Sequence, residues 1–159
     1  MARLAVTGHR GLSRKTEQLV DAALRDFVNA RAEDDLVGLS CLADGADTLF
    51  AHAVLDIGGS LVVIVPARKY REQLPEIHHA TYDHLMSSAT DVIELDHVES
   101  DSAAHMDAGL RMLHETDELV AVWDGQPARG YGGTADVVNA ARRAGIPVTV
   151  IWPDGATRD

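Results

Sequence analysis

The stretch LVGLSCLADGADTLFAHAVLDIGGSLVVIV, residues 36–65, predicts a strand, a helix and a second strand in succession. In its middle, apolar residues recur at the i, i+3, i+4, i+7 and i+8 spacing of a helix that lies on a sheet, namely Ala46, Leu49, Phe50, Ala53 and Val54. The pair Gly58-Gly59 ends this helix. Residues 61–65 are all apolar, as expected of a parallel strand that is buried on both faces. This stretch therefore predicts one β-α-β unit of a parallel sheet.

The same alternation of strands and helices continues along the rest of the chain. Further strands are predicted at 4–7, 91–95, 119–123 and 148–152, besides 36–42 and 61–65. Helices are predicted at about 13–31, at 67–88 with a break near Pro75, and at 102–116. Two more helices are predicted, one that begins at Asp44 as its N-cap and one that begins at Thr134 as its N-cap. The last residues of the chain are expected to fray. The pattern predicts an α/β fold, a Rossmann-like three-layer sandwich with a mostly parallel six-stranded sheet, in one domain over residues 1–155.

Composition and charge limit the classes of partner. The 159 residues carry a net charge of −11, and such a surface repels nucleic acid and anionic lipid, so neither is expected as a partner. The single cysteine, Cys41, excludes an internal disulfide and suits a reducing compartment. The first predicted strand begins almost at Met1, and no apolar stretch reaches the roughly 20 residues that cross a bilayer. We therefore expect a cytoplasmic protein.

Basic residues concentrate where a parallel sheet binds ligands, which is beyond the carboxyl ends of its strands. Seven of the 14 Lys and Arg residues fall in or just after predicted strand ends, namely Arg10, Arg14, Lys15, Arg68, Lys69, Arg71 and Arg129. On an otherwise acidic chain this placement predicts a small anionic ligand held against a helix N-terminus.

The strongest single feature is the run Gly130-Tyr131-Gly132-Gly133-Thr134, between a predicted strand and a predicted helix. Glycines let backbone amides approach a ligand closely, Thr134 adds a hydroxyl, and the helix start adds partial positive charge. Phosphate fits these groups, with Arg129 as a clamp and Tyr131 as a stacking surface. The alternative interpretation is a flexible loop followed by a helix cap.

The run Thr7-Gly8-His9-Arg10-Gly11 is the second candidate segment. Gly8 permits a sharp exit from the first strand, and His9 and Arg10 are candidates to bind phosphate; a glycine turn with exposed polar residues is the alternative. The nucleoside-triphosphate loop is excluded, because Arg14 stands where that motif needs glycine before the lysine. Gly8 and Gly11 do not give the dinucleotide fingerprint either.

Other strand ends supply the remaining candidates. Gly45 and Arg68 complete the predicted ligand-binding set, and Asp47 is either structural or an acceptor for a ribose hydroxyl. Asp124 is an acid, a base or a turn residue. The cluster of His78, His79, Asp83 and His84 lacks the spacing of a metal motif and predicts a solvated helix face, so no metal and no cofactor are expected.

Three of these motifs together resemble one superfamily. Thr-Gly-His-Arg after the first strand, Gly-Ala-Asp-x-Leu at 45–49 and Gly-Gly-Thr at 132–134 are similar to the SMF/DprA–LOG group of Rossmann-like proteins, which contains Lonely Guy-type and lysine-decarboxylase-like nucleotide-binding proteins. The resemblance covers nearly the whole chain. It implies frequent homodimers and a nucleotide-like ligand over the glycine loop, with phosphate at Gly132, Gly133 and Thr134, and with Gly8 and Arg10 lining the pocket.

The hydrolase branch of that superfamily carries P-G-G-x-G-T-x-x-E, and this chain departs from it. The position three after Thr134 is Val137, and Asp136 lies one residue earlier, about 100° away around a helix of 3.6 residues per turn. Glycosidic cleavage needs a carboxylate, for which Asp136, Asp124 and Asp47 are the candidates. We therefore expect a nucleotide-binding sensor or carrier module. The alternatives are a nucleoside 5′-monophosphate phosphoribohydrolase and a scaffold that acts through its dimer surface.

Overall fold

A computed structural model describes residues 2–32 and 35–158 of the chain, so Met1 and residues 33–34 of the expected 1–155 domain lie outside the described residues. The strands are β1 (Arg3–Gly8), β2 (Val37–Ser40), β3 (Ser60–Val65), β4 (Asp91–Glu94), β5 (Glu118–Val122) and β6 (Val148–Ile151). The helices are α1 (Arg14–Asn29), α2 (Ala46–Asp56), α3 (Tyr70–Gln73), the 3₁₀ turn η2 (Glu76–His78), α4 (His79–Ser87), α5 (Ser102–Glu115) and α6 (Thr134–Arg143). The predicted α/β fold is confirmed.

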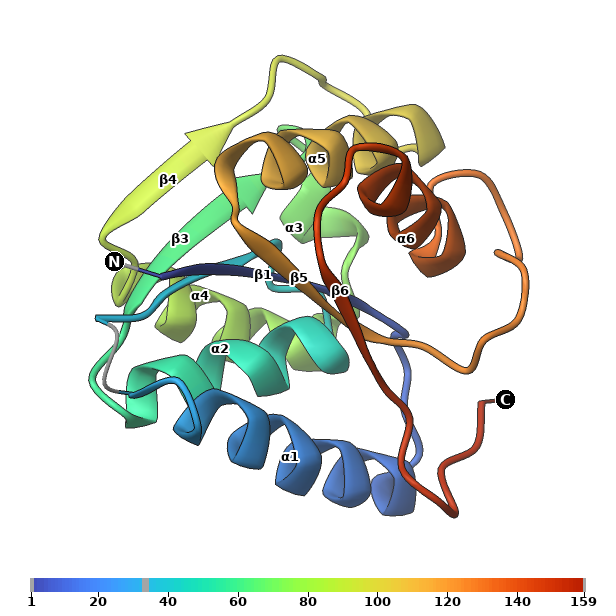
Figure 1. Cartoon of the computed structure of the whole chain (residues 1–159). Helices are drawn as coiled ribbons and strands as arrows, with labels where there is room; N and C mark the ends of the chain where they lie inside the picture. Colours follow the sequence, from blue (N-terminus) through green and yellow to red (C-terminus); the bar gives the residue numbers. More distant parts are fainter. Residues whose placement is uncertain (1, 33–34, 159) are drawn as a thin grey trace.

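All six strands pair in parallel, in the order β4-β3-β2-β1-β5-β6 (Figure 1). The chain builds outward from β1 to β4 and then returns to the other side of β1 for β5 and β6. The strand order therefore reverses between β1 and β5, where Gly8 is opposite Val122. In sheets of this kind, ligands bind in the crevice beyond the carboxyl ends of the strands at such a reversal.

Helices cover both faces of the sheet, with α1, α2 and α4 on one face and α5 and α6 on the other (Figure 1). Side chains alternate along each strand, so Leu4 and Val6 of β1 pack against α1 and α2, while Ala5 packs in the cluster that contains Met112 and Val137. Strand and helix periodicity together produce the three predicted layers.

Two predicted helix caps differ from the structure. The N-caps of α2 and α6 are Gly45 and Gly133, and neither makes a side-chain cap bond, so the assignment of Asp44 and Thr134 as N-caps is wrong. Asp44 instead accepts a hydrogen bond from the Gly11 N–H and pairs with Arg10. A contact between two loops thus replaces the local cap that the sequence pattern favoured.

The segment after β6 was predicted to fray at its end, but hydrogen bonds to α1 hold it in place. Thr16 is buried in α1, and its hydroxyl donates to the Thr157 carbonyl at 3.2 Å and accepts from the Thr157 N–H at 3.0 Å. This pair of bonds holds residues 157–158 beside the carboxyl ends of the strands. Within the described ranges, no helix has the length and apolar character needed to cross a bilayer.

Candidate functional site

A cleft with a volume of about 350 Å³ lies at the carboxyl ends of the strands, at the reversal of strand order. The loop after β1 forms its centre. One wall, which we call the β2–β3 side, consists of Cys41, Ala43, Asp47, Pro66 and Tyr70. The opposite wall, the β5–β6 side, consists of Arg129 to Thr134 together with Thr157 and Arg158. Helix α5 contributes His105, Gly109 and Met112.

The structure brings most of the predicted site residues to this cleft. Those that line it are Gly8, His9, Arg10, Asp47, Arg129, Gly130, Tyr131, Gly132, Gly133 and Thr134. Four other candidates, Gly45, Arg68, Asp124 and Asp136, do not line it. Arg68 has a side chain that is 74% exposed and lies 3.8 Å from Asp96. A Cβ on Gly45 would lie 2.6 Å from the His9 carbonyl oxygen, so this glycine allows two loops to pack closely.

The glycine loop ends at the N-terminus of α6, on the β5–β6 side. The first amides of a helix have no intrahelical acceptor, and they carry partial positive charge. Asp136 anchors the loop, because its Oδ2 accepts from the Gly132 N–H at 2.9 Å. Gly132 has φ +84°, and a Cβ there would lie 2.8 Å from the Ser102 carbonyl oxygen. The loop is therefore held in a defined shape that requires glycine at position 132.

His9 is almost fully buried at the centre of the cleft, with 2% of its surface exposed. Its Nε2 accepts from the Asp124 N–H at 3.0 Å, and its ring packs edge-on against Trp152. Its Nδ1 has no hydrogen-bond partner among the described residues. Burial, then the charge of Arg158, lowers the pKa of His9 and outweighs the opposing effect of the Asp124 carboxylate. His9 is thus a neutral imidazole.

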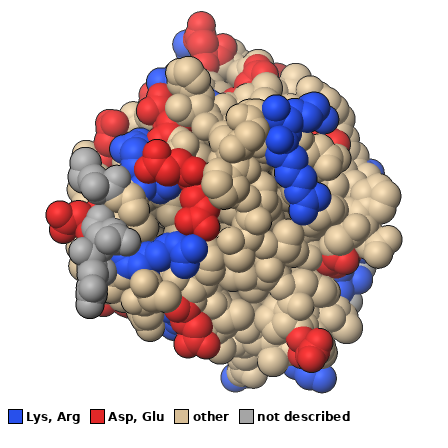
Figure 2. Space-filling model, in the orientation of Figure 1, with Lys and Arg blue, Asp and Glu red and all other residues tan. Residues whose placement is uncertain are grey.

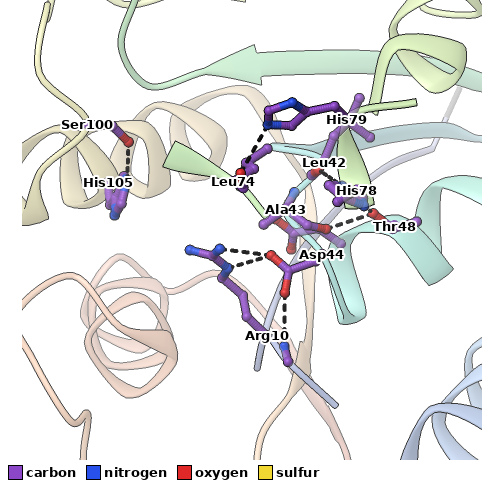
Figure 3. Close-up of polar contacts among 12 residues, drawn as sticks. Arg10, Leu42, Ala43, Asp44, Thr48, Leu74, His78, His79, Ser100 and His105 are labelled. Carbon is purple, nitrogen blue, oxygen red and sulfur yellow. Dashed lines mark hydrogen bonds and ion pairs between the residues drawn. The ribbon is translucent and has the colours of Figure 1, made fainter. Parts of the chain in front are cut away.

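Arg10 approaches the cleft from the loop after β1 and points toward Asp44 (Figure 3). Its Nε and Nη2 both lie 2.8 Å from Oδ1 of Asp44. The Asp44 Oδ2 accepts from the Gly11 N–H at 3.1 Å. The charge of Arg10 is therefore balanced by a neighbouring carboxylate.

Two further cations line the β5–β6 side. Arg129 belongs to the loop after β5, and Arg158 follows β6, with its Nη1 4.0 Å from Oδ2 of Asp124. Both guanidinium groups contribute to lowering the pKa of His9, after burial. Sequence analysis missed Arg158 because the bonds that place it join Thr16 and Thr157, which are 141 positions apart.

The β2–β3 side carries polar groups of a different kind. Burial raises the pKa of Asp47 to about 7, against the lowering effects of the Ala43 N–H and of Arg10. The Ala43 N–H donates to its Oδ2 at 3.3 Å. Tyr70 is 4% exposed, and burial raises the pKa of its hydroxyl well above the usual value. Tyr70 and His105 were also missed by sequence analysis, since nothing local in their segments marks them.

The histidine cluster does not form the single solvated face that was expected. His78 is buried, and its Nε2 donates to the Leu42 carbonyl at 2.9 Å, while Nε2 of His79 donates to Leu74 (Figure 3). The prediction is wrong for His78 because the 3₁₀ turn directs this ring under the loop after β2. Within residues 2–32 and 35–158, no three His, Cys, Asp or Glu side chains gather as a metal site.

Figure 2 shows Lys and Arg in separate groups on the face that it presents, some beside Asp and Glu and one, at the upper right, mainly among other residues. A broad basic strip of the kind that tracks a nucleic acid backbone is not visible on that face.

No protein-family model matches the chain, and the search of curated proteins found no match. Among solved structures, DNA processing protein A from Streptococcus pneumoniae superposes with a TM-score of 0.67 at 18% identity, over 98% of this chain and 52% of that one. DNA processing protein A from Helicobacter pylori gives 0.67 at 13% identity, over 98% and 68%. The molybdenum cofactor binding protein of Rippkaea orientalis gives 0.61 at 15% identity, over 96% and 77%.

These likenesses establish the fold. The chain shares a Rossmann-like fold with these proteins, and the predicted fold is confirmed. It spans about half the length of the Streptococcus pneumoniae protein.

Proposed function

We propose that this chain binds a small phosphorylated nucleoside-type metabolite in the cleft, as a sensor or carrier module. One observation carries the proposal: Arg129, Arg158 and the N-terminus of α6 converge on the same side of one cleft at the reversal of strand order. Guanidinium groups and first-turn amides are the groups with which proteins bind phosphate. The phosphate would therefore lie on the β5–β6 side.

The size of the cleft supports a small ligand. Its volume of about 350 Å³ is near the lower end of the ~300–1,000 Å³ range of small-molecule sites. A mononucleotide suits this space better than a dinucleotide or a polymer. The net charge of −11 supports the same choice over nucleic acid.

The positions of two of the three candidate catalytic carboxylates, Asp136 and Asp124, favour binding over hydrolysis. Asp136 accepts from the Gly132 N–H, and Asp124 contacts His9 and accepts from the Gln126 N–H. Both carboxylates thus support the loops around the cleft. A carrier role also agrees with the shared fold of the molybdenum cofactor binding protein, which is named for binding a cofactor.

Isothermal titration with AMP, GMP, CMP and UMP, and with the matching nucleosides, tests this function. We expect at least one monophosphate to bind, its nucleoside to bind at least tenfold more weakly, and Arg129→Gln to weaken binding at least tenfold. Arg68→Gln is the matched control, since it removes the same charge outside the cleft. Equal binding of nucleoside and nucleotide would refute the proposal, and release of free base on incubation would favour the phosphoribohydrolase instead.

The expected homodimer and cytoplasmic location stay predictions. Sedimentation equilibrium tests the first: a single species of twice the 17.1 kDa chain mass supports it, and a monomer contradicts it.

A further inference from the structure

The β2–β3 side of the cleft contains a hydroxyl that the protein itself does not engage. Tyr70, the first residue of α3, lines the cleft and is 4% exposed. Its O–H has no hydrogen-bond partner in residues 2–32 and 35–158, although its ring contacts Tyr82 and His105 edge-on. A hydroxyl can both donate and accept, so this group, which lines the cleft without a protein partner, is suited to a ligand there.

Asp47 presents a second unused polar group on the same side. Among the described residues, its carboxylate accepts one hydrogen bond, from the Ala43 N–H to Oδ2. Two carboxylate oxygens offer about four acceptor sites, so most of its capacity is available. Asp47 is close enough to Tyr70 to raise the pKa of the phenol, after the larger effects of burial and of Cys41. The phenol therefore stays protonated and able to donate.

The charges on this side do not favour an anion. Arg10 is paired with Asp44, and burial, then Arg10, lower the pKa of His105 and so favour its neutral form. His105 also shares a hydrogen bond with Ser100 through Nε2 at 2.8 Å. Arg129 and Arg158 lie on the opposite side of the cleft. The two walls thus differ in chemistry, one cationic and one with uncharged donors and a carboxylate.

We propose that Asp47 and Tyr70 form a subsite for an uncharged group of the ligand that donates an N–H or O–H to the Asp47 carboxylate and accepts from the Tyr70 hydroxyl. This rests on the proposed function, in which phosphate occupies the β5–β6 side and so orients the rest of the ligand toward α2 and α3. A nucleoside offers this chemistry in two places, the edge of the base and the ribose hydroxyls.

Titration of AMP, GMP, CMP and UMP into Tyr70→Phe and Asp47→Asn tests the subsite. Tyr70→Phe removes one oxygen atom and keeps the ring. Tyr82→Phe is the matched control, since Tyr82 is equally buried, lies 6.1 Å from Tyr70 between ring centroids, and is not among the residues that line the cleft. We expect Tyr70→Phe and Asp47→Asn to bind at least fivefold more weakly than wild type, with Tyr82→Phe unchanged. The melting temperature of each variant verifies folding.

Two further ligands distinguish the source of the group. If the ribose supplies the group, Tyr70→Phe should weaken the binding of ribose 5-phosphate but not that of 2′-deoxynucleotides. If the base supplies it, Tyr70→Phe should weaken the binding of 2′-deoxynucleotides but not that of ribose 5-phosphate. If wild type binds a nucleotide and Tyr70→Phe and Tyr82→Phe bind it with equal affinity, the proposed subsite is overturned but the proposed function is not. Failure of wild type to bind any of the four nucleotides would overturn the proposed function, and the subsite with it.

Discussion

The Arg10 guanidinium and the Asp44 carboxylate, 34 positions apart in the sequence, join the loop after β1 to the loop after β2. Both Nε and Nη2 of Arg10 lie 2.8 Å from Oδ1 of Asp44, and Oδ2 accepts from the Gly11 N–H. One carboxylate therefore satisfies two groups of the neighbouring loop. This contact shapes the centre of the cleft and explains why Asp44 does not cap α2.

Asp44→Ala should lower the free energy of unfolding by about 1 kcal/mol, because a partly exposed ion pair and a backbone hydrogen bond are lost together. Urea denaturation measures the change. Asp96→Ala is the control, since Asp96 lies 3.8 Å from Arg68 in a fully exposed pair, and it should leave the unfolding free energy unchanged. Equal effects of the two substitutions would contradict this account of Asp44.

Gly8→Ala should destabilise the protein by about 1–3 kcal/mol through overpacking. A Cβ at this position would lie 2.4 Å from the Cβ of Ala46 and 2.9 Å from that of Val122. The close packing of β1 on α2 and β5 leaves no room for it. Gly130→Ala meets no atom within 4 Å and is the matched control, with little expected change. Thermal unfolding followed by circular dichroism compares the two variants.

Asp47→Asn should stabilise the protein at pH 8 and have little effect at pH 4. Burial raises the pKa of Asp47 from 3.8 to about 7, so between these values the folded state binds more protons than the unfolded state. Stability therefore falls as the pH rises through this window, by at most about 4 kcal/mol for a shift of about three pKa units. Denaturation of both proteins from pH 4 to pH 8 isolates the contribution of Asp47. If the gain in unfolding free energy of Asp47→Asn does not grow with pH, the pKa of Asp47 is not raised in the folded state.

Thr16→Val should weaken nucleotide binding without touching the cleft directly. The substitution removes the hydroxyl that both donates to and accepts from the Thr157 backbone, and so loosens the segment that carries Arg158. We expect a several-fold loss of affinity in titration calorimetry, in the same direction as Arg158→Gln. Arg143→Gln, on the exposed end of α6, should have no effect. Unchanged affinity in Arg158→Gln would remove Arg158 from the proposed site.

Much of the fold could be predicted from the sequence because its signals are local. The helical spacing around Phe50 and the unbroken apolar run 61–65 depend only on which face of an element is buried. The glycines at 132–133 predicted the start of the helix that borders the cleft.

The parts of the cleft that could not be predicted depend on contacts between distant segments. Asp44 has the residue type and position of a helix cap, and only the fold brings Arg10 to it. Arg158 is near the cleft because Thr157 bonds to Thr16, and Tyr70 is there because a short helix turns its ring under α5. Such placements follow from tertiary packing, for which a single sequence gives no local signal.

The most direct test of the central claim is a titration of ¹⁵N-labelled protein with AMP, GMP, CMP and UMP, followed by amide chemical shifts. If phosphate binds at the N-terminus of α6, the amides of Gly133, Thr134 and Ala135 should show the largest shifts, and inorganic phosphate should shift the same amides. Absence of shifts at these residues, with the largest changes at another surface such as α4 or β4, would contradict the account.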